Sequence, residues 1–241
     1  MTTPRDTHVI FDFDQTLVNH ESTLEIVKSA IGERPNAQPM LEQLQLITAK
    51  ALSGKASLWE MLSVMKMIPY IRKHHIQRYV DTIIGSLDPS LEQTMHNLQR
   101  EGTHLYILSG GYAECIAPIA RSLNIEAKNV IANRLFWAGS RAMCPRPSPL
   151  INPGRGKSRI VQQWRKEGRL TGRALIVGDA RSDYQVYANG WVDGFVCADY
   201  YTKQPMPEMS GHVLRADTPR QVHAHIQTLM NERSWRDDRP R

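Results

Sequence analysis

The chain has 241 residues, of which 41% are hydrophobic and 22% are charged, enough for one large α/β domain or a core with a modest second domain. No apolar run is long enough to span a membrane, and the first residues lack the pattern of a signal peptide, so we expect a cytoplasmic protein with no membrane partner. The net charge of +6 suits a nucleic-acid binder, but no recognition motif accompanies it; we expect no nucleic-acid partner and a solvated basic face that attracts small anions.

The first 85 residues predict one strand followed only by helices. Val9–Phe11 is a short apolar run that predicts a buried strand. Apolar residues at helical spacing then predict helices at about 22–32, 41–54, 57–68 and 73–84. Two of these helices open with a capping box, Ser22–Glu25 and Ser57–Glu60. His74-His75 has no acid or cysteine beside it in the sequence, so we place this pair on the surface.

From residue 86 onward, helices alternate with strands. Asp88-Pro89 predicts a helix start, with the aspartate as its N-cap. Strands are predicted at 105–108, 130–137, 174–177 and 192–197, and helices at about 88–101, 112–122, 157–166, 180–189 and 218–231. A proline-rich loop covers 144–156. The alternation predicts an α/β fold with a Rossmann-like, doubly wound and mainly parallel sheet. We therefore expect a core of residues 1–18 and 86–241, with an inserted small helical cap at 19–85.

Polar side chains gather where predicted strands end or a helix begins. Four such clusters are present: Asp12 with Asp14, Ser109 with Gly110, Lys157, and Asp179 with Asp183. Ligands of an open α/β sheet bind outside the carboxyl ends of its strands, so the clusters converge there if three of the strands are neighbours. Several carboxylates brought together repel one another unless a cation joins them, and hard oxygen ligands favour Mg²⁺.

Hydrolysis of a phosphate monoester is a reaction that uses all of these groups. It is so slow in water that catalysis must supply ~20 kcal/mol or more. A carboxylate nucleophile divides the reaction into two steps, and a metal ion and a lysine neutralise the charge of the transferred group. A serine hydroxyl and glycine N–H groups hold its oxygens. A second carboxylate two residues on protonates the leaving oxygen and later deprotonates water.

These motifs resemble those of the haloacid dehalogenase superfamily of phosphatases. Asp12-Phe13-Asp14-Gln15-Thr16 is similar to the first motif of that superfamily. The resemblance implies that Asp12 is the nucleophile and a magnesium ligand. It also implies that the Asp14 side chain is the acid/base, while the Asp14 backbone carbonyl binds magnesium.

The remaining three motifs follow in the order of the superfamily. Ser109-Gly110-Gly111 resembles the second motif, which binds phosphate, and Lys157 resembles the lysine of the third. Gly178–Asp183 resembles the fourth. There the resemblance implies that Asp179 ligates magnesium, and that Asp183 either ligates it or holds the neighbouring groups in place.

Within the superfamily, the chain most resembles phosphoserine phosphatases, over nearly its whole length. The stretches that carry this resemblance are Asp12–Glu25, Leu108–Tyr112 and Ala132–Leu135. Glu21 lies where those enzymes have a glutamate that contacts the amino group of the substrate. This acid is also typical of a first helical turn, where the helix dipole stabilises it.

The sequence departs from those enzymes in the cap. Met65 and Leu58 stand where the serine enzymes have a carboxylate-binding arginine and a phenylalanine. Methionine makes no bidentate bond to a carboxylate, which leaves Lys66 and Arg72 as alternative partners. The resemblance therefore supports the phosphatase chemistry more strongly than it supports specificity for serine.

The sequence predicts a magnesium-dependent phosphatase that acts on a small phosphomonoester through an aspartyl-phosphate, with a phosphoserine-like substrate as one candidate. A different small metabolite, such as a phosphorylated polyol, sugar or biosynthetic intermediate, is the first alternative. Transfer of the phosphoryl group to an alcohol and non-catalytic binding of a phosphoryl ligand are the others. The oligomeric state does not follow from the sequence.

Overall fold

A computed structural model describes residues 6–35, 37–52, 63–152, 154–202, 206–207 and 209–232. The predicted capping box Ser57–Glu60, with Leu58, lies outside the described residues, as do Gly54 and most of the third predicted helix. Among the residues that are described, no helix is both long and apolar enough to cross a membrane.

A six-stranded sheet forms the centre of the molecule, with the order β3-β2-β1-β6-β7-β8. Every strand pair in it is parallel. The strands are β1 (Thr7–Phe11), β2 (His104–Tyr112), β3 (Val130–Asn133), β6 (Arg173–Gly178), β7 (Gly194–Ala198) and β8 (Val213–Ala216). From β1, the chain first adds β2 and β3 on one side and then β6, β7 and β8 on the other. The predicted doubly wound sheet is therefore confirmed, and its strand order reverses between β1 and β6.

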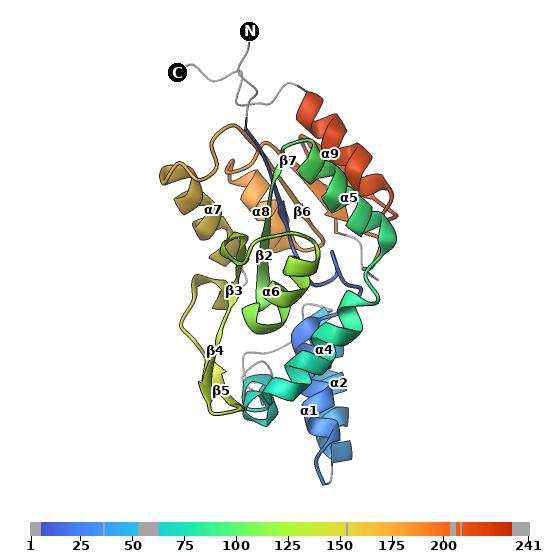
Figure 1. The fold of residues 1–241 in the computed structure, drawn as a ribbon, viewed down its shortest axis with the longest axis vertical. Coiled ribbons are helices and arrows are strands. Elements are labelled where there is room, and N and C mark those ends of the chain that lie inside the picture. The colour runs from blue at the N-terminus through green and yellow to red at the C-terminus, as the bar shows by residue number, and fades with distance from the viewer. Residues whose placement is uncertain are drawn as a thin grey trace.

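Helices cover both faces of the sheet (Figure 1). One face carries α5 (Pro89–Arg100), α6 (Ala113–Ser122) and α9 (Gln221–Asn231), and the other α7 (Gly156–Lys166) and α8 (Arg181–Ala188). Alternate residues of β1 serve the two layers: Val9 and Phe11 pack with the first set, and Ile10 with the second. Burial on both faces explains why this strand is an unbroken apolar run.

A helical block lies beyond one end of the sheet (Figure 1). Its described elements are α1 (Ser22–Gly32), α2 (Ala37–Leu52), the 3₁₀ turn η1 (Ile68–Tyr70) and α4 (Lys73–Ile84). The chain enters this block from β1 and leaves it into α5. The predicted helices at 22–32 and 73–84 are confirmed at both ends, and so is the Asp88 N-cap of α5, whose side chain accepts a hydrogen bond from the Ser90 N–H at 2.8 Å.

A two-stranded antiparallel hairpin is separate from the main sheet and forms hydrogen bonds with the helical block. It comprises β4 (Leu135–Ala138) and β5 (Arg141–Pro145). The Ala142 N–H donates to the Ile71 carbonyl, and the Lys73 N–H donates to the Ser140 carbonyl, both at 3.0 Å. Short 3₁₀ turns, η2 (Ala127–Asn129) and η3 (Pro149–Ile151), flank the segment. The sequence predicts neither β5 nor β8, since neither has a distinctive period.

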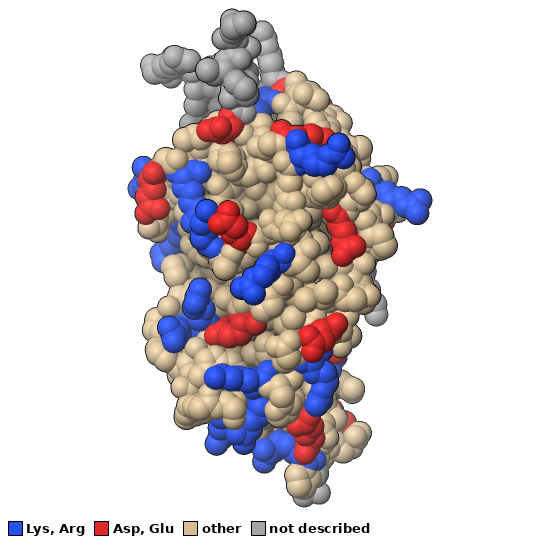
Figure 2. Space-filling model, in the orientation of Figure 1, with Lys and Arg blue, Asp and Glu red and all other residues tan. Residues whose placement is uncertain are grey.

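Positive charge gathers around the hairpin. Figure 2 shows Lys and Arg side chains concentrated over the part of the surface where β4, β5 and the helical block lie, with acids among them. Several of these cations sit over aromatic rings. The Arg34 guanidinium lies 4.1 Å from the centre of the Tyr70 ring, and the Arg146 guanidinium 4.9 Å from that of Phe136. Such contacts position a cation without neutralising it.

Two local predictions need correction. Ser22 does not cap α1: Glu21 is the N-cap residue, and its side chain makes no capping hydrogen bond. The Ser22 N–H donates instead to the Asp14 carboxylate, at 2.8 Å. Strand β2 also does not end at Leu108 but continues to Tyr112 across an irregularity in its pairing with β3. Pairing of Tyr112 with Asn133 of β3 extends the strand. No local signal in the sequence predicts this pairing.

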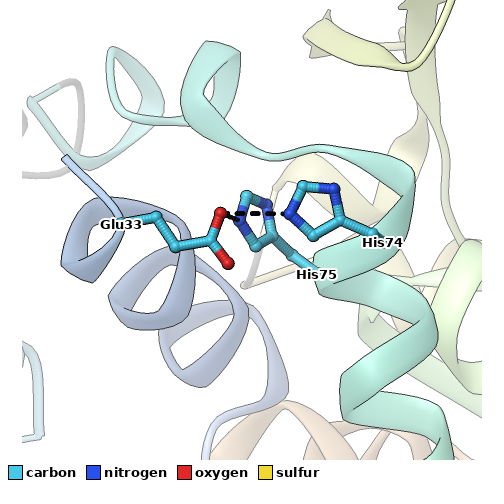
Figure 3. Close-up of side chains that lie close together, drawn as sticks. All are labelled: Glu33, His74 and His75. Carbon is cyan, nitrogen blue, oxygen red and sulfur yellow. Dashed lines mark hydrogen bonds and ion pairs between the residues drawn. The ribbon is translucent and has the colours of Figure 1, made fainter.

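The surface prediction for the histidine pair is wrong for one of its members. His75 is only 2% exposed and His74 is 55% exposed, and the imidazole Nε2 atoms of both contact the Glu33 carboxylate at the end of α1 (Figure 3). The Arg78 guanidinium donates to the second Glu33 oxygen at 3.0 Å. The Arg72 N–H donates to Nδ1 of His75, which leaves the proton of the neutral ring on Nε2. This arrangement favours a hydrogen-bonded tie between α1 and α4 over a metal site.

Replacing Glu33 with Gln should loosen this tie. The hydrogen bonds from His75, His74 and Arg78 lower the pKa of Glu33 to about 2. Because this pKa lies below the ordinary value, the stabilisation is complete above the unfolded pKa and is lost as the pH falls through the folded one. The melting temperature of Glu33→Gln should therefore fall below that of the wild type at neutral pH, and the difference should shrink in acid. Glu42→Gln, at an exposed site on α2, is the control; an equal effect there would contradict the assignment.

Candidate active site

The predicted polar clusters meet at the carboxyl ends of three adjacent strands. Asp12 directly follows β1, and Asp179 directly follows β6. Ser109 and Gly110 lie near the carboxyl end of β2. All four line one cavity of about 400 Å³, together with Lys157. The neighbouring positions of β2, β1 and β6 in the sheet cause this convergence. We refer to the part of the cavity formed by these residues as the floor.

A buried lysine joins two of the carboxylates. Lys157, the second residue of α7, is 7% exposed, and its Nζ lies 2.8 Å from Asp12 Oδ2 and 2.6 Å from Asp183 Oδ1. Burial alone would lower the pKa of Lys157, but the charges and hydrogen bonds of the two carboxylates outweigh it and raise the pKa above its usual value. Lys157 therefore stays charged beside the proposed nucleophile.

Asp183 has both carboxylate oxygens engaged and no exposed surface. Its Oδ1 accepts from Lys157, and its Oδ2 accepts from the Ala180 N–H at 3.3 Å. Gly178 makes room for it, because a Cβ there would lie 2.4 Å from the Asp183 Cγ. Of the two roles that the sequence leaves open for Asp183, this geometry favours holding Lys157 in place.

Asp14 lies against the start of α1. Its Oδ1 accepts the Ser22 N–H, and its Oδ2 would lie 3.2 Å from a Cβ at Gly111, so a glycine lets β2 approach it closely. Burial raises the pKa of Asp14 to about 8; the carboxylates of Glu21 and Asp12 add to the rise and the hydrogen bond from Ser22 opposes it. A carboxyl group with this pKa holds a proton near neutral pH, as an acid catalyst must.

The acidic cluster fits a divalent cation. Asp12, Asp179 and Asp183 each offer a carboxylate oxygen within 4.8 Å of the others. Burial, followed by the charges of Asp12 and Asp183, raises the pKa of Asp179 to about 8, which shows how unfavourable the charged group is without a counter-ion. An all-oxygen set of this kind suits Mg²⁺. The family resemblance implies a further magnesium ligand, the backbone carbonyl of Asp14, and this residue lines the same cavity.

The sequence gives no role to Asn133, which contacts the segment predicted to bind phosphate. Its side-chain Nδ2 donates to the Gly110 carbonyl at 2.7 Å from the end of β3, and it is buried. The Ser109 hydroxyl accepts the Gly111 N–H at 3.0 Å. Together these bonds fix the orientation of the peptides after Ser109. The contact between Asn133 and Gly110 cannot be predicted from the sequence, because the two residues lie on different strands and are far apart along the chain. Asn133 does lie in a stretch that carries the family resemblance.

Above the floor, the cavity has an upper wall of different composition. The upper wall consists of Glu21, Thr23, Met65, Tyr112, Pro145, Leu150, Ile151 and Asn152. Both tentative specificity residues, Glu21 and Met65, are therefore in the cavity. Lys66 and Arg72, the alternative partners for a substrate carboxylate, are not among the described residues that line it. Thr23 and Tyr112 lie in stretches that carry the family resemblance, but the other members of the upper wall belong to no motif, so the sequence gives no signal for them.

Comparisons with known proteins agree with this geometry. Residues 9–187 match the family of haloacid dehalogenase-like hydrolases. The chain belongs to this family. It is 28% identical over 191 residues to the chloroplastic phosphoserine phosphatase of Arabidopsis thaliana, covering 78% of this chain and 61% of that protein. It is 25% identical over 183 residues to human phosphoserine phosphatase, covering 73% and 75% of the two chains.

A solved structure shares the fold. A phosphoserine phosphohydrolase-like protein from Francisella tularensis superposes with a TM-score of 0.67 at 22% identity, over 93% of this chain and 99% of that one. At this identity the likeness establishes the architecture alone. The mainly parallel sheet with its attached helical block is therefore the shared feature, and the chemistry depends on the residues of the floor.

Mg²⁺ should stabilise the protein through the acidic cluster. A cation that binds only the folded state at 100 times its dissociation constant adds about 2.7 kcal/mol, which raises the melting temperature by roughly 5 °C or more for a chain of this size. Thermal denaturation with MgCl₂, with NaCl at matched ionic strength and with EDTA measures the shift. Asp179→Asn should lose the shift. In EDTA above pH 8, where the Asp179 carboxyl of the wild type is charged, the variant should be at least as stable as the wild type, because a repelling charge is gone. Asp81→Asn, at an exposed site on α4, should retain it.

Gly178→Ala should destabilise the protein and displace Asp183. The added methyl group overlaps the Asp183 side chain, so we expect a loss of about 1–3 kcal/mol in unfolding free energy. Urea denaturation measures this loss. Gly32→Ala is the matched control, because a Cβ at Gly32 meets nothing within 4 Å. Equal stability of the two variants would show that Asp183 has room to move.

Proposed function

We propose that the protein is a magnesium-dependent phosphatase that hydrolyses a small phosphomonoester through a phosphorylated Asp12. The observation that carries the proposal is the position of Asp12 at the cavity floor, with its Oδ2 held 2.8 Å from the buried Lys157 ammonium. Ser109 lies on the same floor, and Asp14 lines the same cavity. These are the nucleophile, the cation, the acid and the phosphate ligand that the reaction requires.

In the first step, an Asp12 carboxylate oxygen attacks phosphorus. The bond from phosphorus to the ester oxygen breaks, and the Asp14 carboxyl proton passes to that oxygen, so that the alcohol leaves neutral. Lys157 and the donors of Ser109 and Gly110 hold the oxygens of the transferred group. The cation, when bound to Asp12 and Asp179, supplies positive charge that offsets the negative charge of the transferred phosphoryl group.

In the second step, water attacks the phosphorus of the aspartyl-phosphate. Asp14, now ionised, takes a proton from the water, and the bond between Asp12 and phosphorus breaks. Inorganic phosphate leaves, while Asp12 is again a carboxylate and Asp14 is again protonated. The cycle consumes one water and one ester, and it produces one alcohol and one phosphate.

We also propose that residues 19–85 act as a cap that shapes the site. Glu21 and Thr23 at the start of α1, and Met65 before η1, contribute to the upper wall, whereas the floor comes from strand ends. A cap over such a floor excludes water and selects the leaving group. The named relatives make phosphoserine the reference substrate against which this selection is best measured.

Asp12→Asn should abolish turnover without unfolding the protein. We expect kcat with p-nitrophenyl phosphate and Mg²⁺ to fall by on the order of 10⁴-fold or more, because the amide is a poor nucleophile. The wild type, quenched in acid during turnover, should carry one added phosphoryl group on the peptide containing Asp12. Asp81→Asn is the control for substitution of an aspartate. Retained activity in Asp12→Asn would exclude the nucleophile, and phosphate release without a trapped aspartyl-phosphate would exclude the two-step route.

A further inference from the structure

The cavity is larger than a phosphate group requires. Its volume of about 400 Å³ lies in the range of sites that enclose organic ligands. The phosphate occupies the floor, where Asp12, Ser109 and Lys157 lie. The leaving group must then contact the upper wall, so the chemistry of that wall indicates what the leaving group is.

Glu21 gives the upper wall a negative charge. It is the one carboxylate of the upper wall and, within the described part of the chain, no hydrogen-bond donor contacts it. Its side chain is half-buried beside the floor. Among the described residues, no cation forms an ion pair with this carboxylate, and an ammonium group on the ligand would supply both the charge and the donors.

A second anion on the ligand would meet no free cation among the described residues of the cavity. Lys157 is the only cationic side chain among the described residues that line the cavity, and its Nζ lies within 2.8 Å of Asp12 and 2.6 Å of Asp183. A carboxylate on the leaving group would instead face Glu21. Burying a charge beside a like charge, without a counter-ion, is unfavourable.

The remainder of the upper wall is largely apolar. Met65 comes from the segment before η1, whereas Leu150 and Ile151 both come from the turn η3, and all three line the same cavity. Met65 and Ile151 are 39% and 46% exposed, which is high for apolar side chains at a cavity. An apolar substituent on the ligand would remove this surface from water.

We propose that the substrate is the phosphate monoester of an amino alcohol that bears an apolar substituent and no carboxylate. This inference rests on the proposed phosphatase function and specifies its leaving group. The bond between phosphorus and the alcohol oxygen breaks, water supplies the new oxygen on phosphorus and the proton on the alcohol, and the ammonium group is unchanged. Glu21 binds the ammonium group, and Met65 and Ile151 contact the substituent.

Four esters separate the effects of the two charges. O-phosphoethanolamine has the ammonium group alone, phosphoserine has both groups, phosphoglycolate has the carboxylate alone, and ethyl phosphate has neither. We expect the ammonium group to raise kcat/KM by about tenfold or more, and the carboxylate to lower it by a similar factor. The phosphate ester of phenylalaninol should exceed phosphoethanolamine. Phosphoserine as good as phosphoethanolamine, or ethyl phosphate as good as either, would overturn the proposal.

Binding separates this proposal from the phosphatase function itself. The same esters are titrated into Asp12→Asn with Mg²⁺, and calorimetry gives the order of their affinities without turnover. If the wild type hydrolyses none of the esters and no p-nitrophenyl phosphate, the phosphatase function fails, while the order of affinities still tests the ligand class. If the wild type hydrolyses p-nitrophenyl phosphate but the carboxylate-bearing esters bind best, the phosphatase function stands and the ligand class is wrong.

A substitution in the upper wall should reverse the preference. Met65→Arg introduces the missing cation, and the ratio of kcat/KM for phosphoserine to that for phosphoethanolamine should rise by about tenfold or more. Ile84→Arg is the matched control, since Ile84 is 40% exposed and does not line the cavity; its ratio should equal that of the wild type. Glu21→Gln should reduce the advantage of the ammonium group. An unchanged ratio in a folded Met65→Arg would place that side chain away from the ligand.

Discussion

The site depends on one buried ammonium group held between two carboxylates. Lys157 comes from α7, Asp12 from the end of β1 and Asp183 from α8, so a single pair of contacts fixes three elements relative to one another. Removing one partner of a buried ion pair leaves an uncompensated charge, which costs several kcal/mol. The position of Asp12, the proposed nucleophile, is therefore tied to the packing of α7 and α8 on one face of the sheet. Stability and chemistry here rely on the same atoms.

That arrangement leaves an excess of negative charge at the floor. Asp12, Asp14, Asp179 and Asp183 are four carboxyl groups around one lysine. A phosphate ester is an anion, so it approaches such a floor only when the negative charge has been reduced. Two features would reduce it: a proton retained on Asp14, which burial favours, and a cation that the remaining acids would share. The acidic set therefore supports the proposal that this site also binds a metal ion.

Sequence patterns predict most of the sheet and the floor because their signals are local. The run Val9–Phe11 and the acids directly after it mark a strand end within a few residues. The contacts that escape prediction are long-range. Glu33 meets His75 from 42 residues away, and Asn133 reaches Gly110 across a strand pairing. Ser22 shows a conflict: its sequence favours a helix cap, but the Asp14 carboxylate takes its N–H, so the tertiary contact overrides the local preference.

The same distinction separates the reaction from the substrate. Strand ends in a doubly wound sheet lie at fixed positions, so residues placed there act together in any chain with this strand order. The upper wall has no such constraint. Glu21, Met65 and Ile151 come from a helix start, the segment before η1 and the turn η3. Each of these segments can change without disturbing the sheet, so a family resemblance at the floor says little about the ligand above it. The ligand class has to be inferred from charge and polarity at the wall, where the lack of a free cation among the described residues is as informative as the carboxylate of Glu21.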